Sequence, residues 1–280
     1  MWTEENRQRH NRDKLRYPSD LTDDEWAVLE PLIPPARLGG RKRGVDMREV
    51  VNGALYVLST GCQWRAIPKG LPPRSTVHGY YLGWEHDGTL KDIHHALYQM
   101  CREKEGRAAS PTACIVDSQS VKSAEKGGKS IDPKGYDAGK KVSGIKRHLV
   151  VDTQGLLLHA IVHTADIQDR DGGAMALSTM FGLHPFLGKL YADGGYQGPQ
   201  FRAALAKALP GLEVEIVKRS DAAKGFELLP RRWVVERTIA WLNRCRRLSK
   251  DFECRHRSSL AAIRLASIRL MLRKLCNSSG

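Results

Sequence analysis

The change of hydrophobic periodicity after residue 112 constrains the fold more than any other feature of this chain. Before it, apolar residues recur at helical spacing; beyond it, three runs of strand type follow one another, and helical stretches then alternate with strands. The predicted elements are strands at 113–117, about 142–152 and about 156–163, a helix at about 167–181, a strand at about 189–193, a helix at about 198–208, a strand at about 213–218 and a helix at about 230–248. This order predicts an α/β domain with a mixed sheet.

Three carboxylates occupy related places in this succession, which is that of an RNase H-like sheet. Asp117 and Asp193 end the first and fourth strands, which are neighbours in such a sheet, and Glu236 lies in the last helix, which packs across them. Each acid alone has an ordinary explanation as a turn cap or an ion-pair partner. Together they favour a metal site, because Mg2+ prefers oxygen ligands and two ions about 4 Å apart can hold both oxygens of an in-line phosphoryl displacement.

The charge balance indicates which kind of molecule would supply the phosphate group for such a reaction. The chain has 45 Lys and Arg against 31 Asp and Glu, a net charge of +14. The segment 231–276 holds 13 basic and 3 acidic residues. A basic stretch alone is usually a solvated face, but beside a carboxylate cluster it favours nucleic acid as the partner.

Helical patterns fill the first part of the chain. Thr22 is the predicted N-cap of a short helix, a second helix runs from about 46 to 59, and further helices begin near Ser75 and after Thr89. A helix, a Gly-containing turn and another helix resemble a helix-turn-helix, although small helical bundles share this pattern. The predicted organisation is a flexible tail at 1–16, a helical DNA-binding domain at 17–105, a linker at 106–112, a catalytic domain at 113–250 and a basic C-terminal helix at 251–280.

Candidate DNA contacts cluster near the predicted acids. The segment 122–147 holds eight basic and three acidic residues and leaves the first strand just after Asp117. Arg232 lies one helical turn before Glu236, where its planar donor fork could grip a phosphate. The candidates are Lys122, Lys140, Lys141, Lys146, Arg147, Arg232, Asn243, Arg244 and Arg247.

The six cysteines are far apart and form no C-x-x-C pair, so we expect reduced thiols in a cytoplasmic protein. Cys254 and His256 have no second ligand pair at zinc spacing. No apolar run approaches the length of a membrane span, and the first residues do not resemble a signal peptide.

Three blocks of sequence resemble the catalytic blocks of bacterial insertion-sequence transposases, specifically the IS-five family of DDE enzymes. They are Asp117-Ser118-Gln119-Ser120-Val121-Lys122, Ala192-Asp193-Gly194-Gly195-Tyr196, and residues 232–238 with Trp241-Leu242-Asn243-Arg244. Residues 136–152, 165–172 and 17 to about 87 are also similar to that family. The wider superfamily pattern around the Glu has Tyr and Lys where this chain has Leu229 and Asn243.

The resemblance implies a transposase that binds the terminal inverted repeats of its own element, with Asp117, Asp193 and Glu236 as the catalytic and metal-binding triad. It implies two Mg2+ ions per site, with Mn2+ as a substitute, double-stranded DNA as ends and target, and a homodimer when two ends are brought together. The alternatives are a DNA-binding or regulatory protein derived from a transposase, and an RNase H-like nuclease without strand transfer.

Overall fold

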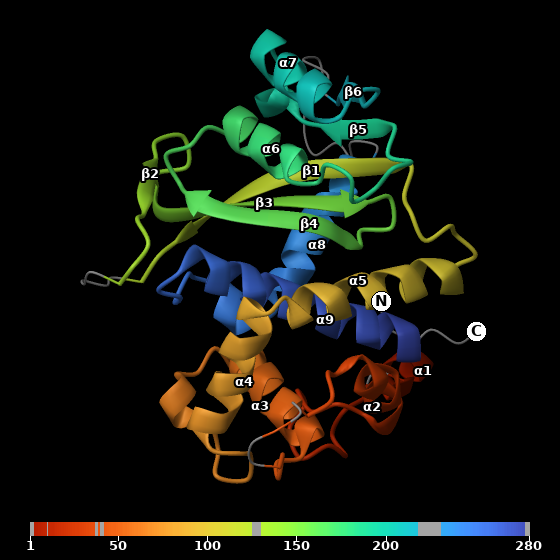
Figure 1. Cartoon of the computed structure of the whole chain (residues 1–280), viewed down its shortest axis with the longest axis vertical. Helices are drawn as coiled ribbons and strands as arrows, with labels where there is room; N and C mark the ends of the chain where they lie inside the picture. Colours follow the sequence, from red (N-terminus) through yellow and green to blue (C-terminus); the bar gives the residue numbers. More distant parts are fainter. Residues whose placement is uncertain are drawn as a thin grey trace. The chain divides into compact units, whose positions relative to one another are not determined.

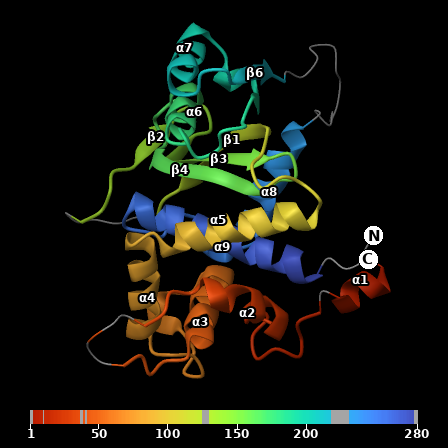
Figure 2. The ribbon, with the colours of Figure 1, turned by 45° about the vertical axis from the view of Figure 1, so that its right-hand side comes forward.

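The computed structural model describes residues 3–9, 11–36, 39, 42–124, 130–217 and 231–277. It divides the chain into two compact units (Figures 1 and 2). Unit 1 comprises Met1–Arg107, Cys245–Leu248 and Arg264–Gly280, and unit 2 comprises Ala108–Arg244 and Ser249–Ile263. Residues 245–248 therefore pack within unit 1, although the sequence analysis assigned them to the catalytic domain. Most of the last helix also packs within unit 1, although it was assigned to a separate C-terminal segment.

Unit 1 is helical. Its elements are α1 (Glu4–Arg9), α2 (Asp23–Leu29), η1 (Glu30–Leu32), α3 (Met47–Thr60), η2 (Trp64–Ala66), α4 (Arg74–His86), α5 (Thr89–Lys104), η4 (Arg246–Leu248) and the C-terminal part of α9 (His256–Asn277). The Thr22 hydroxyl accepts a hydrogen bond from the Glu25 amide (3.1 Å), and the Glu25 carboxylate accepts one from the Thr22 amide (3.0 Å). This capping box confirms Thr22 as the N-cap.

The segment 1–16, for which the sequence predicts a flexible tail, contains a short helix and several contacts in its described part. Residues 4–9 form α1. Arg12 makes two hydrogen bonds to the Glu25 carboxylate, at 2.9 and 2.7 Å, and Arg16 pairs with Asp20 and Glu49. Because Glu25 is only 2 % exposed, the first of these ion pairs is shielded from water and holds the segment in place.

Unit 2 contains a mixed sheet, as the sequence predicted, but with six strands and not five. Its strands are β1 (Ala113–Lys122), β2 (Gly135–Asp137), β3 (Val142–Asp152), β4 (Leu157–Thr164), β5 (Lys189–Ala192) and β6 (Glu213–Ile216). The order is β2-β3-β1-β5-β6, and β4 pairs with β3. Strand β3 is antiparallel to β1, β2 and β4, whereas β5 is parallel to β1 and β6. The first and fourth predicted strands are therefore neighbours; only the short β2 was not predicted.

Helices cover both faces of this sheet. Helices α6 (Asp169–Ser178) and α7 (Pro199–Ala208) lie above the sheet in Figure 1, and α8 (Arg232–Asn243) descends from its other face. Successive strand residues point to opposite faces. The α6 and α7 face buries a core of Cys114, Val116, Val150, Ala176, Leu177, Met180, Leu190, Ala192, Tyr196, Phe201 and Leu205. Asp117, between Val116 and Ser118, therefore points toward α8.

The turn between β3 and β4 holds α8 in place. The Thr238 hydroxyl donates to the Gly155 carbonyl (2.8 Å), and Arg237 donates to the Gln154 carbonyl (2.9 Å). Gly155 has φ +86°, and a Cβ atom there would lie 2.7 Å from the Thr238 hydroxyl oxygen, so glycine is needed for both reasons. The predicted helix at 230–248 instead ends at Asn243 and is followed by η4.

Candidate active site

Asp117 lies in the middle of β1, opposite Leu149 of β3. Its carboxylate accepts a hydrogen bond from the Ser118 amide at 2.7 Å. Burial raises the pKa of Asp117 to about 6, and that hydrogen bond opposes the rise. The charges of Asp193 and Glu236 raise the pKa further, while Arg232 lowers it. Asp117 is therefore within electrostatic reach of both other predicted acids.

Asp193 follows β5 directly and is the N-cap of the short helix η3 (Gly194–Tyr196). Its carboxylate accepts a hydrogen bond from the Gly195 amide at 2.8 Å. A Cβ atom at Gly195 would lie 3.0 Å from that carboxylate, and one at Gly194 would meet nothing within 4 Å. The Gly-Gly pair thus leaves the space beside Asp193 open.

Glu236 projects from α8, and its side chain is 52 % exposed. Nη2 of Arg232 lies 3.2 Å from Oε1 of Glu236 and 3.6 Å from Oδ2 of Asp193. One guanidinium therefore bridges the acid of the helix and the acid that follows β5. Arg231, with φ +67° just before α8, stacks its guanidinium on the Tyr191 ring at 4.4 Å from the centroid, which joins the start of the helix to β5.

The donor chemistry suits hard divalent cations. Three carboxylates supply only oxygen ligands, and their mutual repulsion is what a bound cation would relieve. Arg232 already places a positive charge between two of them. Within the part of the chain that the structure describes, no three His, Cys, Asp or Glu side chains are gathered closely enough to hold one ion. A metal would therefore require the carboxylates to close in and Arg232 to yield its place between Asp193 and Glu236.

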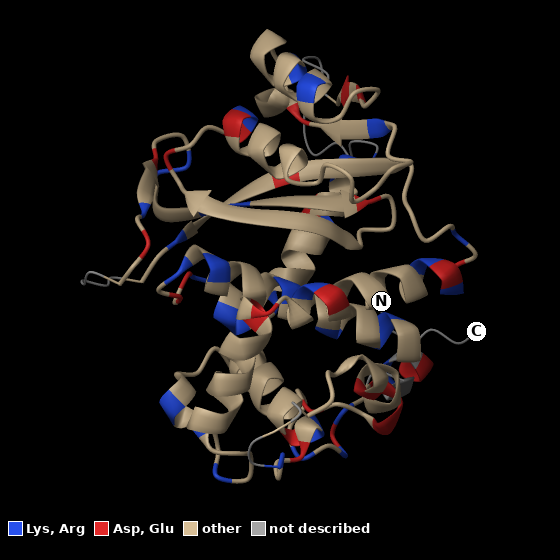
Figure 3. Ribbon diagram, in the orientation of Figure 1, with Lys and Arg blue, Asp and Glu red and all other residues tan. Residues whose placement is uncertain are grey.

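The candidate DNA contacts differ in accessibility. Lys122, Lys140, Lys141 and Arg244 are exposed, and Arg232, Asn243 and Arg247 are partly buried. The Lys140 ammonium lies 3.3 Å from the hydroxyl of Ser118, next to Asp117 in sequence. Arg247 belongs to unit 1, where it donates to the Cys62 carbonyl at 3.3 Å. Leu229 lies outside the described residues. Figure 3 shows Lys and Arg on the segments around β2 and β3.

Lys146 and Arg147 do not fit the expected role of DNA contacts, because both residues are buried, at 4 and 3 % exposure. The Lys146 ammonium pairs with Asp169 (2.8 Å) and Asp137 (3.4 Å) and donates to the Ile167 carbonyl (2.7 Å). Burial lowers the pKa of Arg147 to about 10, against the opposing charge of Asp251 and Glu253. Neither side chain is placed to reach a phosphate backbone.

A buried polar network on the α6 face was missed by the sequence analysis. The Tyr196 hydroxyl lies 3.2 Å from Nδ1 of His148, and the His148 and His163 rings stack with centroids 5.0 Å apart. Burial lowers the pKa of His148 to about 3, so the imidazole is neutral at physiological pH. The signal in the sequence was a histidine inside the apolar part of β3 and the Gly-Gly pair at 172–173, against which these rings pack.

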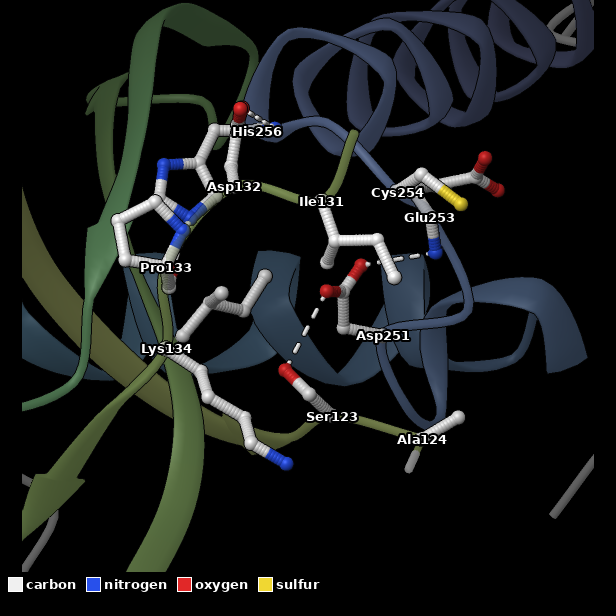
Figure 4. Close-up of a pocket in the computed structure, with 11 residues that line it drawn as sticks. Ser123, Ala124, Ile131, Asp132, Pro133, Lys134, Asp251, Glu253, Cys254 and His256 are labelled. Atoms are coloured by element: carbon white, nitrogen blue, oxygen red, sulfur yellow. Dashed lines mark hydrogen bonds between the residues drawn. The ribbon is translucent and has the colours of Figure 1, made fainter. Parts of the chain in front are cut away.

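A small pocket in unit 2 contains none of the three acids. It lies between the segments 130–134 and 251–256, and Figure 4 shows Asp251 bonded to Ser123 on its wall. His256 donates its amide to Asp132 and bonds through Nε2 to the Pro133 carbonyl, at 2.7 and 2.9 Å. The lining residues are Ser123, Ala124, Ile131, Asp132, Pro133, Lys134, Ile145, Asp251, Glu253, Cys254 and His256. Cys254 and His256 therefore line this pocket and do not belong to the group of three acids.

Comparisons with known proteins give matches to two family descriptions and to relatives from one organism. Residues 108–271 match the family described as "Transposase DDE domain", and residues 21–94 match "Putative transposase of IS4/5 family". One similar protein is the "Putative transposase for insertion sequence element IS402" of Burkholderia cepacia, 37 % identical over 122 residues, which are 40 % of this chain and 55 % of the relative. Another is the "Insertion element IS402 uncharacterized 16.2 kDa protein" of the same organism, 31 % identical over 116 residues, which are 39 % of this chain and 78 % of the relative. The chain thus spans about half the length of the first relative. None of the helices described is both long and apolar enough to cross a bilayer.

Proposed function

We infer the activity of this protein from its family: the chain belongs to the transposases with a DDE domain, because that match covers more than half of its length. We propose that it is a DNA transposase which cuts the ends of an insertion sequence and joins them to target DNA. One observation carries the assignment of the site: Arg232 bridges Asp193 and Glu236, and both acids act electrostatically on Asp117. The three acids lie on different elements, and their charges interact. Asp117 lies within β1, Asp193 follows β5 and Glu236 projects from α8.

In this proposal Asp117, Asp193 and Glu236 hold two Mg2+ ions, for which Mn2+ can substitute. When bound, such ions supply Lewis-acid stabilisation to the attacking and leaving oxygens. The first reaction forms a bond between the oxygen of water and phosphorus and breaks the bond from phosphorus to the 3′ oxygen, which leaves as a hydroxyl. In the second, that 3′ oxygen attacks a phosphorus of the target and displaces another 3′ oxygen.

The protein's own side chains position the strand for both displacements. Arg232, released from Asp193 and Glu236, would donate its fork to a nonbridging phosphate oxygen. Lys140 and Lys141, both exposed on the turn before β3, would hold the backbone of the same strand, with Lys122, Asn243 and Arg244 as further contacts. The Lys140 ammonium reaches the hydroxyl of Ser118, which is next to Asp117 in sequence but points to the opposite face of β1.

Substrate, partners and location belong to the same proposal. The helical domain at 17–105 would bind the terminal inverted repeats, and two copies of the chain would bring two ends together. The protein would act in the bacterial cytoplasm, where the DNA lies. Residues 106–112 would link that domain to the catalytic domain at 113–250.

The test is an assay with a labelled duplex of the element's end and a plasmid target in Mg2+ or Mn2+. We expect cleavage at the end and joined product with the wild type, and neither with Glu236→Gln, which keeps the size of the side chain but removes its charge. Cleavage without joined product would favour a nuclease. Specific binding without either reaction would favour a DNA-binding protein derived from a transposase.

A further inference from the structure

Tyr196 carries a buried hydroxyl where packing alone would be served by phenylalanine. Its side chain is 0 % exposed, and so is that of His148. The hydroxyl lies 3.2 Å from Nδ1 of His148, and the side chain of Ser118 is a second polar neighbour. A hydroxyl is costly to bury without a hydrogen-bond partner. The bond to His148 therefore defines a specific arrangement.

The partners of Tyr196 form a cross-strand pair. Ser118 of β1 lies directly opposite His148 of β3, and the adjacent pair in the same register is Asp117 with Leu149. Because neighbouring residues on a strand point to opposite faces, Tyr196 holds the pair from the face opposite the Asp117 side chain. Tyr196 itself stands three residues after Asp193, at the end of η3. Its hydroxyl thus ties the turn that carries Asp193 to the strand that carries Asp117.

The protonation of His148 fixes the direction of this hydrogen bond. With the proton of the neutral imidazole on Nδ1, His148 donates to the Tyr196 oxygen. Nε2 of His148 has no hydrogen-bond partner, which fits a ring nitrogen without a proton. The Ser118 hydroxyl, which accepts from the Lys140 ammonium at 3.3 Å, lies beside both the Tyr196 hydroxyl and the Asp169 carboxylate.

The residues packed around the Tyr196 ring leave it little room to move. A Cβ atom at Gly173 would lie 2.4 Å from Cε1 of Tyr196, and one at Gly172 would lie 2.3 Å from Nε2 of His148. On another side the ring packs on Phe201, with centroids 5.8 Å apart. Helix α6 and Phe201 therefore fix the direction in which the hydroxyl points.

We propose that Tyr196 is a positioning residue for the acidic site: through His148 and Ser118 its hydroxyl sets the separation of Asp117 and Asp193, and thereby the affinity of the site for divalent cations. This inference rests on the proposed function, because it takes the acids to be metal ligands. The role belongs to the hydroxyl and not to the ring, which distinguishes it from ordinary core packing.

The test is calorimetric titration of Mn2+ into the full chain without DNA. Tyr196→Phe removes only the hydroxyl, and we expect Mn2+ affinity to fall by about 10-fold or more, the effect typical of residues that orient metal ligands. Phe201→Leu is the matched control, because it loosens the packing of the same ring and removes no hydrogen bond. Both variants should lower the metal-free Tm, and only Tyr196→Phe should weaken Mn2+ binding. Equal Mn2+ affinity in the two variants would overturn the proposal.

A second comparison tests the route through His148. The amide of His148→Asn can occupy the position of Nδ1 and keep the bond to Tyr196, whereas His148→Leu cannot. We expect His148→Asn to retain most of the Mn2+ affinity and His148→Leu to match Tyr196→Phe. The double variant with Tyr196→Phe and His148→Leu should bind no more weakly than either single variant. Additive losses would show that the two side chains act separately and would overturn the proposal.

The outcomes separate this inference from the proposed function. If the wild type binds Mn2+ and Asp193→Asn abolishes binding, while Tyr196→Phe binds as the wild type does, only the role of Tyr196 fails. If the wild type binds no Mn2+ in the site, or Asp193→Asn has no effect on binding, the proposed metal site fails and the inference fails with it.

Discussion

Arg232 lies one helical turn before Glu236, and its Nη2 is 3.2 Å from Oε1 of that residue. The same nitrogen reaches Asp193 at 3.6 Å, so a single guanidinium compensates two of the three acids. The Arg232 side chain is 20 % exposed and those of Asp193 and Glu236 are 30 and 52 % exposed, so each pair is weakened by water. The proposed function requires a metal at this place. The carboxylates would therefore be paired with Arg232 in the metal-free protein and with the metal when it is bound.

Arg232→Gln should therefore have opposite effects with and without metal. Loss of the guanidinium leaves the acids to repel one another, so the free energy of unfolding without metal should fall by about 0.5–1 kcal/mol. The rise in Tm on addition of Mn2+ should be larger than in the wild type, because no guanidinium competes for the carboxylates. Arg232→Lys, which keeps the charge, is the control. A Mn2+ shift in Arg232→Gln smaller than that of the wild type would contradict this account.

Asp117 predicts a pH dependence of stability. Its pKa is raised from 3.8 to about 6 in the folded protein, so between these values the folded state binds more protons than the unfolded state. Its contribution to stability thus falls as pH rises from about 4 to about 6 and is constant above that. Asp117→Asn should be more stable than the metal-free wild type at pH 7.5, by at most about 3 kcal/mol, and the difference should vanish near pH 4. Denaturant unfolding at several pH values measures this, and a variant less stable than the wild type at pH 7.5 would refute it.

The sequence could place the three acids on their elements because each depends on local pattern: Asp117 and Asp193 follow apolar runs, and Glu236 lies in a helical one. It could not predict that Lys146 and Arg147 are buried, because burial on both faces of β3 follows from helices on both sides of the sheet. The bond between Tyr196 and His148 was equally out of reach, since it depends on the register of Ser118 with His148. The ion pairs of Arg12 with Glu25 and of Arg16 with Glu49 join residues far apart in sequence, so no local pattern reveals them.

Helix α6 should tolerate no side chain at its glycines. Gly172→Ala places a Cβ atom 2.3 Å from Nε2 of His148, and Gly173→Ala places one 2.4 Å from Tyr196. Overpacking of this kind costs about 1–3 kcal/mol, which exceeds the gain in helix propensity of up to about 1 kcal/mol. Gly79→Ala on α4, where a Cβ atom meets nothing within 4 Å, should instead stabilise the protein. Thermal unfolding of the three variants checks this, and equal shifts for Gly79→Ala and Gly173→Ala would contradict the packing described.

The anchor of α8 gives a further prediction. The hydroxyl of Thr238 is buried and bonds the carbonyls of Gly155 (2.8 Å) and Val234 (3.0 Å). Thr238→Val removes both bonds at nearly constant volume and should cost about 1–3 kcal/mol. Thr238→Ser keeps the hydroxyl and should retain the cleavage rate better than Thr238→Val, because α8 carries Glu236. Chemical denaturation and a single-turnover cleavage assay measure the two effects. Identical rates in the two variants would show that this anchor does not position Glu236.

Lys140 should contribute one phosphate contact to DNA binding, which is measurable as a change in the salt dependence of the binding constant. Lys140→Ala is expected to reduce the slope of log K against log salt by about 0.9, the effect of losing one phosphate contact. Lys189→Ala is a matched control, because Lys189 stands at the start of β5, away from the Asp193 end, and is paired with Glu213 and Glu215. Fluorescence anisotropy with a labelled duplex at several salt concentrations gives both slopes. An unchanged slope for Lys140→Ala would exclude it from the interface.

The central claim is that Asp117, Asp193 and Glu236 act as one unit in DNA cleavage, and the additivity of their variants tests it most directly. Single-turnover cleavage of the labelled end in Mg2+ should be measured for Asp117→Asn, Asp193→Asn, Glu236→Gln and the three double variants. Residues that act as a unit are strongly non-additive. We predict that each single variant loses cleavage by about 1,000-fold or more, and that no double variant is measurably slower than the slower of its two single variants. Cleavage retained in any single variant, or losses that multiply in the double variants, would contradict a shared site.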